Sequence, residues 1–327
     1  MKRSGRLHGG SPCAPPTPGR QVSDTMQTAV LHGAHRVHHA GSSNRRSPPV
    51  RAAFSGPPGQ VATLRQNSVN FVNFAPFRDS GPPVLTLATT TPGEPEIFAS
   101  LQGEGASLGK PTAFVRLSRC NLACQWCDTA YTWRFSGDNR PHRDNLAFER
   151  GANQLVLDEA EVAERITALG QPRLVITGGE PLLQGAALAK MVALLPAAMA
   201  IEIETNGTVA PHPELDPLVH QYNVSPKLAH SGNPATLALL PERLAAFAAD
   251  PRAWFKFVIA DPDDLSEVLA LRDKHAMNPE RIFLMPEGTS AAVLHQRLRW
   301  LAPLALEQGL RLTDRLHIHL YGDTRGT

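Results

Sequence analysis

Three cysteines in one short run constrain what this chain can fold into more than any other feature. Cys120, Cys124 and Cys127 lie in the segment RCNLACQWCDTAYTW with the spacing C-x3-C-x2-C. A loop with this spacing can wrap a cubane iron-sulfur cluster, giving one thiolate to each of three irons and leaving the fourth iron without a protein ligand. The open iron then needs a ligand that is not protein, so the run predicts a cluster that binds a small molecule.

Zinc and disulfides are the alternatives for these cysteines. A tetrahedral zinc site needs a fourth ligand, and the only other cysteine is Cys13, far upstream, although His142 could complete such a site. Disulfides are disfavoured because three cysteines cannot pair evenly and the N-terminus lacks the apolar core of a secretory signal. The spacing favours the cluster and leaves zinc open.

Composition divides the chain into two unlike parts. Residues 1–90 carry ten Lys or Arg against Asp24 and Asp79, a charge of +8, so the remainder holds 22 of the 32 basic and 28 of the 30 acidic residues. Runs such as SPCAPPTPGR show neither helical nor strand periodicity, so we expect residues 1–95 to be a disordered, basic, low-complexity extension. A solvated extension, or upstream sequence translated from a misassigned start, is favoured over a transit peptide or a nucleic-acid tether.

From Glu96 to Thr327, short β-branched runs alternate with longer amphipathic ones, which predicts one α/β domain of parallel strands with crossover helices. Active sites of such sheets and barrels gather at the C-terminal strand ends, where the cysteine loop and the motifs TGGEP, ETNG, SPK and MPEG all fall. No run of about twenty apolar residues occurs, so we expect no membrane span. The expected strands are Ala113–Leu117, Arg173–Thr177, Ala200–Thr205, Tyr222–Val224, Trp254–Ile259, Arg281–Met285 and Leu316–Leu320, and the expected helices fall within 157–170, 182–195, 260–276 and 290–309.

The cysteine spacing, with Trp126 just before the last cysteine, resembles the cluster loop of the radical S-adenosylmethionine (SAM) enzymes. In that family the amino and carboxylate groups of SAM chelate the open iron. The segment Thr177-Gly178-Gly179-Glu180-Pro181, by itself an ordinary tight turn, resembles the element that contacts the SAM amino group. Glu202 and Glu204 look like further SAM contacts, as does Ser225-Pro226-Lys227. The resemblance thus implies cluster ligands at Cys120, Cys124 and Cys127 and SAM contacts at Trp126, Cys127, Asp128, Gly179, Glu180, Glu204, Ser225, Pro226 and Lys227.

A further set of matches resembles the 7-carboxy-7-deazaguanine synthases of queuosine and 7-deazapurine biosynthesis. EIFASLQGEG, FVRLSRCNLACQWCDTAYTW, TGGEP, SPK and the terminal RLHIHLYGDTRGT carry this resemblance over nearly all of residues 96–327. It implies a partial TIM-like β/α barrel of the radical SAM type, and a lyase with a [4Fe-4S] cluster, SAM and Mg2+. Such enzymes convert 6-carboxy-5,6,7,8-tetrahydropterin to 7-carboxy-7-deazaguanine with loss of ammonia, by hydrogen abstraction and ring contraction.

The same resemblance assigns roles around the substrate. Arg116 can form a two-pronged ion pair with the substrate carboxylate, and Gln102 and Glu104 suit the pterin ring edge. Thr129 resembles the Mg2+ ligand of the family, although a hydroxyl is a weak ligand for this cation. Either His317 or His319 faces the pterin, since both would share one strand face. The implied catalytic residues are Arg116, Glu104 and His317, and the implied substrate contacts are Leu101, Gln102, Gly103, Glu104, Arg116, Thr177 and Thr327.

The resemblance also implies the partners of the protein: a small pterin substrate, an electron donor such as a flavodoxin, and a second copy of the chain in a homodimer. It implies a cytoplasmic location as well.

Two alternative functions remain. A glycyl-radical activating enzyme shares the cysteine spacing but acts on a protein, and QGEG, Arg116 and Cys127-Asp128-Thr129 suit a small acid better. A zinc-stabilised nucleic-acid-binding protein would place basic residues on its folded part, whereas that part is acidic here, so no nucleic acid is expected.

Overall fold

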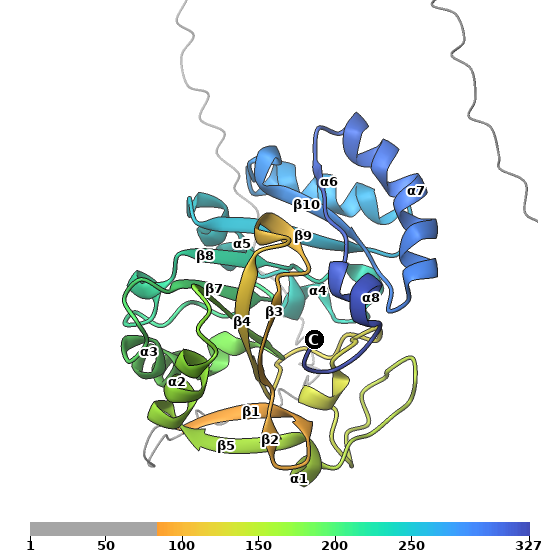
Figure 1. Cartoon of the computed structure of the whole chain (residues 1–327). Coiled ribbons are helices and arrows are strands. Elements are labelled where there is room, and N and C mark those ends of the chain that lie inside the picture. Colours follow the sequence, from red (N-terminus) through yellow and green to blue (C-terminus); the bar gives the residue numbers. More distant parts are fainter. Residues whose placement is uncertain (1–83) are drawn as a thin grey trace, which may run out of the picture. The chain divides into compact units, whose positions relative to one another are not determined.

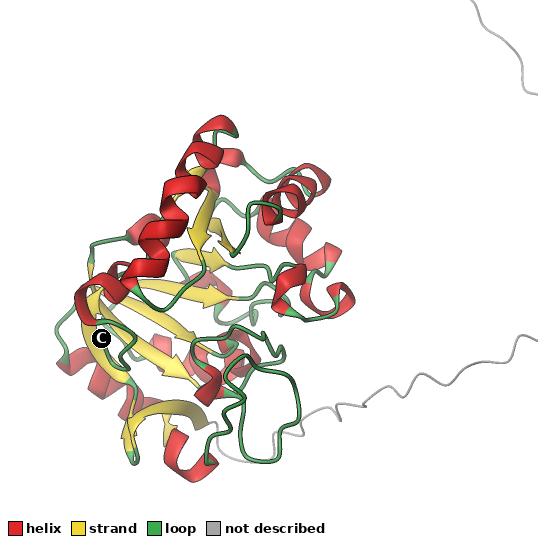
Figure 2. Ribbon diagram, turned by 90° about the vertical axis from the view of Figure 1, so that its right-hand side faces the viewer, coloured by secondary structure: helices red, strands yellow, loops and turns green. Residues whose placement is uncertain are grey.

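A computed structural model of the chain describes residues 84–327. Its centre is a curved sheet in which parallel strands lie side by side in chain order (Figures 1 and 2). Within the described residues the strand order ends at β11 and β2 instead of closing, which confirms the expected partial barrel. The parallel strands are β4 (Pro111–Leu117), β6 (Arg173–Gly178), β7 (Ala200–Thr205), β8 (Gln221–Val224), β9 (Ala253–Ile259), β10 (Ile282–Pro286) and β11 (Arg311–Leu312).

Crossover helices connect these strands and cover the outer face of the sheet, whereas the C-terminus of the chain lies on the inner side, near the cysteine loop (Figure 1). Their apolar residues fill the layer between helices and sheet; Val162 and Ile166 of α2, for example, are completely buried. No helix among the described residues is long and apolar enough to cross a membrane. The helices are α1 (Arg150–Asn153), α2 (Glu159–Ala168), α3 (Gly185–Ala193), α4 (Ala235–Ala238), α5 (Pro241–Ala249), α6 (Asp264–Lys274), α7 (Ala291–Glu307) and α8 (Leu316–Tyr321).

Four antiparallel strands extend the sheet beside β4, and they correct the predicted domain boundary. They are β1 (Val84–Thr91), β2 (Glu94–Pro95), β3 (Ile97–Leu101) and β5 (Gln154–Asp158). Leu85 and Leu87 of β1 are fully buried, so residues 84–95 belong to the folded domain and not to the extension. Because β1 is buried on both faces, it lacks the alternation that marks a half-exposed strand. The rest of the predicted extension lies outside the described residues.

Polar side chains fill the barrel interior toward the N-terminal strand ends. The buried carboxylate of Glu202 forms an ion pair with Arg173 and accepts hydrogen bonds from Ser107 Oγ (2.5 Å) and Asn223 Nδ2 (3.2 Å). Glu202 therefore stabilises this end of the barrel, and its predicted contact with SAM is wrong. Glu204 lies two residues further along β7, on the same face and nearer the C-terminal strand ends.

One predicted strand is wrong. Residues 316–320 form helix α8, although the alternating sequence LHIHL has the period of a strand. Only Ile318 is buried among these residues, and Leu320 is half exposed, so one side of the segment packs against the protein. The backbone N–H of Leu316 donates to the carbonyl of Gly103 (2.9 Å), which fixes the start of the helix against the loop after β3. The other six predicted strands are confirmed to within two residues at each end.

Candidate active site

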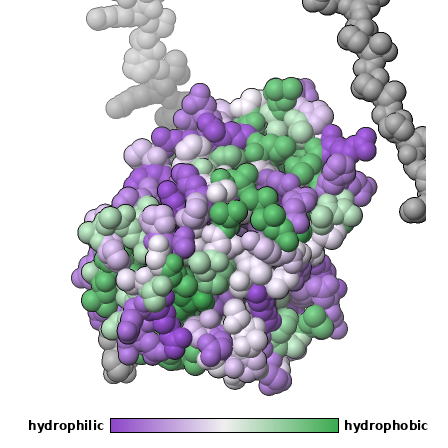
Figure 3. All heavy atoms as spheres, viewed as in Figure 1, coloured by the Kyte–Doolittle hydropathy of each residue, from purple (hydrophilic) through white to green (hydrophobic). Residues whose placement is uncertain are grey.

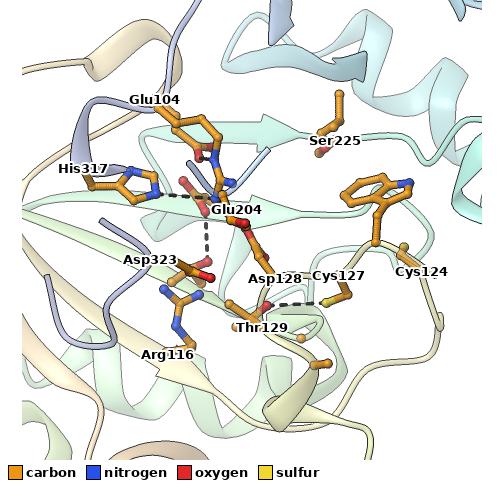
Figure 4. A pocket seen from close by; sticks show the side chains of 18 of the residues that line it. Glu104, Arg116, Cys124, Cys127, Asp128, Thr129, Glu204, Ser225, His317 and Asp323 are labelled. Atoms are coloured by element: carbon orange, nitrogen blue, oxygen red, sulfur yellow. Dashed lines mark hydrogen bonds and ion pairs between the residues drawn. The ribbon is translucent and has the colours of Figure 1, made fainter. Parts of the chain in front are cut away.

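A cavity of about 550 Å³ lies at the C-terminal ends of the parallel strands. Residues from every region that the sequence marked as functional line it, and Figure 4 shows part of this lining. The lining includes all the predicted cluster, metal, catalytic and substrate residues, namely Leu101, Gln102, Gly103, Glu104, Arg116, Cys120, Cys124, Cys127, Thr129, Thr177, His317 and Thr327, together with Trp126, Asp128, Gly179, Glu204, Ser225 and Lys227 of the predicted SAM contacts.

The cysteine loop begins directly after β4 and is held by backbone and side-chain contacts. Arg119, with a φ of 79°, turns the chain out of the strand, and the N–H of Cys127 donates to the carbonyl of Cys124 (3.2 Å). The indole of Trp133 donates to Cys127 Sγ (3.3 Å), and Asn233 Nδ2 donates to Cys124 Sγ (3.3 Å). The three thiols therefore line one cavity in a fixed loop, as ligands of one cluster must.

Burial raises the pKa of all three cysteine thiols, to about 11 for Cys124. Free thiols in this environment hold their protons at neutral pH. Thiolates, and not thiols, are the ligands of iron, so cluster assembly must release protons from Cys120, Cys124 and Cys127. A buried set of three thiols beside polar cavity walls fits a cluster with one open iron.

The geometry does not favour zinc. No group of three His, Cys, Asp or Glu side chains in residues 84–327 is arranged to hold a single metal ion. The Nε2 atom of His142 lies 2.8 Å from the backbone carbonyl of Cys127 and is engaged there. Cys13, the other candidate for a fourth ligand, lies outside the described residues.

The glycines of TGGEP pack against the cysteine loop. The N–H of Gly179 donates to the carbonyl of Leu117 (3.1 Å), and a Cβ on Gly179 would lie 2.1 Å from the carbonyl oxygen of Arg119. A Cβ on Gly178, whose φ is 142°, would lie 2.1 Å from the oxygen of Leu117. The sequence suggested that the missing side chains of these glycines let a ligand approach the backbone. In the structure the space is filled by the chain's own backbone, although Gly179 also lines the cavity.

Two predicted SAM contacts, Glu180 and Pro226, are buried outside the cavity lining. The Glu180 carboxylate accepts from the N–H groups of Leu182 (3.0 Å) and Asn206 (2.7 Å) and from the hydroxyl of Thr205 (3.0 Å). Burial raises the pKa of Glu180 to about 7, against the effect of these hydrogen bonds. Its side chain joins the ends of β6 and β7, so the prediction that it contacts SAM is wrong for the side chain.

Arg116 at the end of β4 points into the cavity (Figure 4). Its Nε donates to Glu96 Oε1 (2.8 Å), and Glu96, only 1% exposed, also accepts from the hydroxyl of Tyr131 (2.8 Å). Within the described residues, the terminal amino groups of Arg116 make no hydrogen bond to protein. This arrangement fixes the guanidinium by one edge and presents the other to a carboxylate, the two-pronged geometry that Arg favours.

A hydrogen-bonded row of side chains crosses the floor of the cavity. Thr177 Oγ1 donates to Glu204 Oε2 (2.9 Å), and Gln102 Nε2 donates to Glu204 Oε1 (3.3 Å). Gln102 is almost fully buried, and its Oε1 accepts from the N–H of Glu104 (3.2 Å). Glu204 therefore connects β7 to β6 and to the QGEG loop, and it reaches the substrate wall as well as the predicted SAM side.

Glu104 lies between two cations that sequence reasoning missed. It forms an ion pair with Lys256 of β9 and accepts from Arg315 Nε (3.0 Å). Burial would raise the pKa of Glu104, but Lys256 and Arg315 together hold it well below its ordinary value. A lone Lys within the apolar strand AWFKFVI was the available signal for Lys256, because a charged residue inside a buried strand is almost always paired.

Arg315 connects several walls of the cavity. Besides Glu104 it pairs with Asp128 of the cysteine loop, and it donates to the carbonyl of Gly288 (2.6 Å). Burial would raise the pKa of Asp128, but Arg315 lowers it, so both of these carboxylates are ionised. Arg315 begins the terminal motif RLHIHLYGDTRGT, but the sequence assigned it no role, since its partners are distant in sequence.

Helix α8 separates the two histidines that the sequence left unresolved. His317 lines the cavity, where its Nε2 lies 3.4 Å from the guanidinium of Arg315, and burial lowers its pKa. His319 instead lies 2.9 Å from Asp314, and it is not part of the cavity lining. Gly103 makes room for His317, because a Cβ there would lie 2.2 Å from its Nδ1. Of the two histidines, His317 is therefore the one that lines the cavity.

The C-terminal segment closes one side of the cavity. Arg325 lies over the ring of Tyr131 (3.5 Å to the centroid) and donates to Asn153 (2.9 Å), which anchors the segment to the body of the domain. Thr327 then lines the cavity, as the sequence predicted, and so does Asp323, which sequence reasoning missed. Asp323 is among the labelled lining residues in Figure 4.

On the side of the cavity near Cys124, Lys227 donates to Ser225 (2.8 Å) and lies over the Trp126 ring (5.7 Å). Trp126 also stacks on His230, and its indole N–H is buried without a partner. A cation, a hydroxyl and an aromatic face next to the cysteine loop form a surface suited to a polar ligand with an aromatic base. These residues fit a SAM molecule bound beside the cluster.

Comparisons with known proteins agree with this geometry. Residues 115–223 match the model of the Radical SAM superfamily. The 7-carboxy-7-deazaguanine synthase of Pyrobaculum aerophilum is 39% identical over 232 residues, covering 71% of this chain and 95% of the relative, and that of Halobacterium salinarum is 34% identical, covering 71% and 91%. The crystal structure of QueE from Escherichia coli has a TM-score of 0.51 at 25% identity, covering 71% of this chain and 95% of QueE.

The substitution Glu104→Gln tests the charge balance of the cavity. It leaves Lys256 and Arg315 without their shared anion, so we expect a loss of about 3 kcal/mol in the free energy of unfolding, measured by urea denaturation at pH 7. The control is Glu161→Gln, which breaks the exposed pair with Arg165 and should cost less than about 1 kcal/mol. Equal effects of the two substitutions would contradict this view of Glu104.

Proposed function

Because this chain belongs to the 7-carboxy-7-deazaguanine synthase family of radical SAM enzymes, we propose that it converts 6-carboxy-5,6,7,8-tetrahydropterin to 7-carboxy-7-deazaguanine with release of ammonia. One observation carries the proposal: a single cavity is lined both by the three cysteines of the cluster loop and by Arg116 and Glu104. The cavity thus has a cluster side and a side for a small carboxylated heterocycle.

The cofactors of this family are a [4Fe-4S] cluster and SAM, which together supply a 5′-deoxyadenosyl radical for hydrogen abstraction. The chain's own residues bind and orient the reactants. Lys227, Ser225 and the aromatic ring of Trp126 would hold SAM beside the cysteine loop, and Gly179 at the end of β6 would contribute backbone to the same site. Placing the radical source and the substrate in one cavity shields both from water and fixes the distance between them.

Arg116 binds the substrate carboxylate through the guanidinium edge that Glu96 leaves available. Gln102 and Glu104 hold the polar edge of the pterin, and Thr177 and the backbone at Leu101 and Gly103 bound its plane. Glu104 accepts from the pterin N–H groups as a carboxylate, because Lys256 and Arg315 keep it ionised. His317 is neutral at pH 7, since burial lowers its pKa, so it is available to accept or donate a proton at one nitrogen.

The alternatives fit less well. A glycyl-radical activating enzyme must admit a protein segment, whereas the relatives that this chain matches over most of their length are synthases of a small molecule. Zinc would need a fourth ligand that the described residues do not bring to the cysteines.

We extend the proposal to Mg2+, with Thr129 as its protein ligand. Thr129 occupies the N-cap position of a short 3-10 helix (Ala130–Thr132), but its hydroxyl makes no capping hydrogen bond and lines the cavity instead. It lies 3.6 Å from Cys127 Sγ (Figure 4). Substrate oxygens and water would complete the octahedron that Mg2+ requires.

The substitution Thr129→Val should remove the stimulation by Mg2+ while preserving the shape of the residue. We expect the turnover of the variant to become independent of Mg2+ concentration between zero and millimolar, with the iron content of the holoenzyme unchanged. Thr208→Val, which removes a hydroxyl outside the cavity lining, is the control and should keep the Mg2+ response. Retained stimulation in Thr129→Val would assign the ion to other ligands.

The activity itself is tested anaerobically. The reconstituted enzyme is supplied with SAM, a strong reductant, Mg2+ and 6-carboxy-5,6,7,8-tetrahydropterin, and 7-carboxy-7-deazaguanine is sought by mass spectrometry. Cys124→Ala should abolish product, and Arg116→Lys, which loses the two-pronged contact, should lower kcat/KM at least tenfold, about 1.4 kcal/mol. Cleavage of SAM to 5′-deoxyadenosine without the deazaguanine product would retain the radical chemistry and reject this substrate.

We also propose a homodimer, a cytoplasmic location and reduction by a flavodoxin-like donor, on the strength of the family. Figure 3 shows hydrophobic residues gathered on the face of the domain around α8, where Leu320 and Tyr321 are exposed. This exposed apolar surface supports an interface there.

The substitution Leu320→Glu tests this interface and should shift the protein from dimer to monomer in analytical ultracentrifugation. Leu194→Glu, at an exposed leucine after α3, should leave the dimer intact; a monomeric wild type would end the proposal.

A further inference from the structure

Two side chains outside the cluster-ligand motif donate hydrogen bonds to cysteine sulfurs. Trp133 Nε1 lies 3.3 Å from Cys127 Sγ, and Asn233 Nδ2 lies 3.3 Å from Cys124 Sγ. Among the described residues these are the side-chain N–H groups that contact the three thiols. Within residues 84–327, Cys120, the first cysteine, receives no such side-chain N–H donor, so the pattern around the predicted cluster is asymmetric.

Asn233 is held in place for this contact. Its Oδ1 accepts from the N–H of Ala123 (2.9 Å), inside the cysteine loop, and its backbone N–H donates to Ser231 Oγ (3.3 Å). The residue before it, Gly232, has a φ of 77°, and a Cβ there would lie 2.4 Å from the side chain of Gln125. A segment after β8 is thus pressed against the cysteine loop, and its amide group can reach the sulfur.

Trp133 is held equally firmly. Its ring is 5% exposed, lies edge-on to His142 with centroids 6.3 Å apart, and carries the guanidinium of Arg140 on one face (4.7 Å). These contacts leave the ring little freedom to turn, so the indole N–H remains directed at Cys127. Both donors are therefore built into the fold and do not depend on a bound ligand.

We propose that Trp133 and Asn233 raise the reduction potential of the cluster through their N–H···S hydrogen bonds. This inference rests on the proposed function in one respect, that the cysteines hold a [4Fe-4S] cluster. Reduction adds negative charge to the cluster and its thiolates, and a hydrogen bond to a thiolate sulfur stabilises the state with more negative charge. Removing a donor makes the cluster harder to reduce without changing its ligands.

The test is a redox titration of the reconstituted full-length holoenzyme, with the reduced cluster followed by electron paramagnetic resonance. Trp133→Phe keeps the ring and loses the N–H; Asn233→Leu removes the second donor. Each should lower the ratio of reduced to oxidised cluster at a fixed potential about tenfold, a shift of about 59 mV for a one-electron couple. Trp254→Phe is the matched control, because Trp254 of β9 packs against Phe283 of β10, outside the cavity lining. Its titration should follow the wild type.

Resonance Raman spectra of the same samples give a second readout, since loss of a hydrogen bond to sulfur should raise the iron–cysteine stretching frequency. Unchanged midpoints and frequencies in both variants would overturn the proposal. A loss of iron with an unchanged midpoint for the remaining cluster would also overturn it, because the two side chains would then only hold the loop. Failure of the wild type to assemble any cluster would count against the proposed function instead.

Discussion

The packing of Gly178 and Gly179 against the backbone of residues 117–120 is the contact on which the site depends. The end of β6 and the start of the cysteine loop share the space that two side chains would otherwise fill, and two backbone hydrogen bonds join them. Buried backbone groups must be paired, so the loop can take this course only where a strand end offers donors at short range. The same contact places the cysteines beside the strand ends that carry the substrate residues.

Charge pairing organises the opposite wall. Glu104, Lys256 and Arg315 come from three separate elements, and each would be costly to bury alone. Together they fix the QGEG loop to β9 and to the segment before α8, and Arg315 continues the network to Asp128 in the cysteine loop. The guanidinium of Arg315 therefore joins the cysteine loop to the loop that carries Glu104. This connection suits a reaction in which a radical must be held close to one carbon atom of the substrate.

Much of the fold was predictable because its signals are local. Parallel strands buried on both faces read as short apolar runs, and six of seven such predictions are confirmed. The failures have physical causes. Residues 316–320 alternate like a strand, but they form helix α8, in which Ile318 alone is buried. Strand β1 was missed because it directly follows a Pro-rich run, and the composition of that run hid the strand. The TGGEP motif predicted a contact between Glu180 and SAM, yet the Glu180 carboxylate accepts hydrogen bonds from Leu182, Thr205 and Asn206.

The sequence by itself determined the cysteine loop, the alternation of parallel strands with crossover helices, and the residues at the strand ends, since spacing and periodicity are properties of neighbouring residues. Only the tertiary structure decided which of those residues share a cavity. It placed His317 and not His319 in the cavity lining, and it left Glu202 and Glu180 outside that lining. It also added Lys256 and Arg315 to the lining and brought Trp133 and Asn233 to the cysteine sulfurs. The physical reason is that a buried charge or an N–H donor can find its partner in a residue more than two hundred positions away, which no local pattern records.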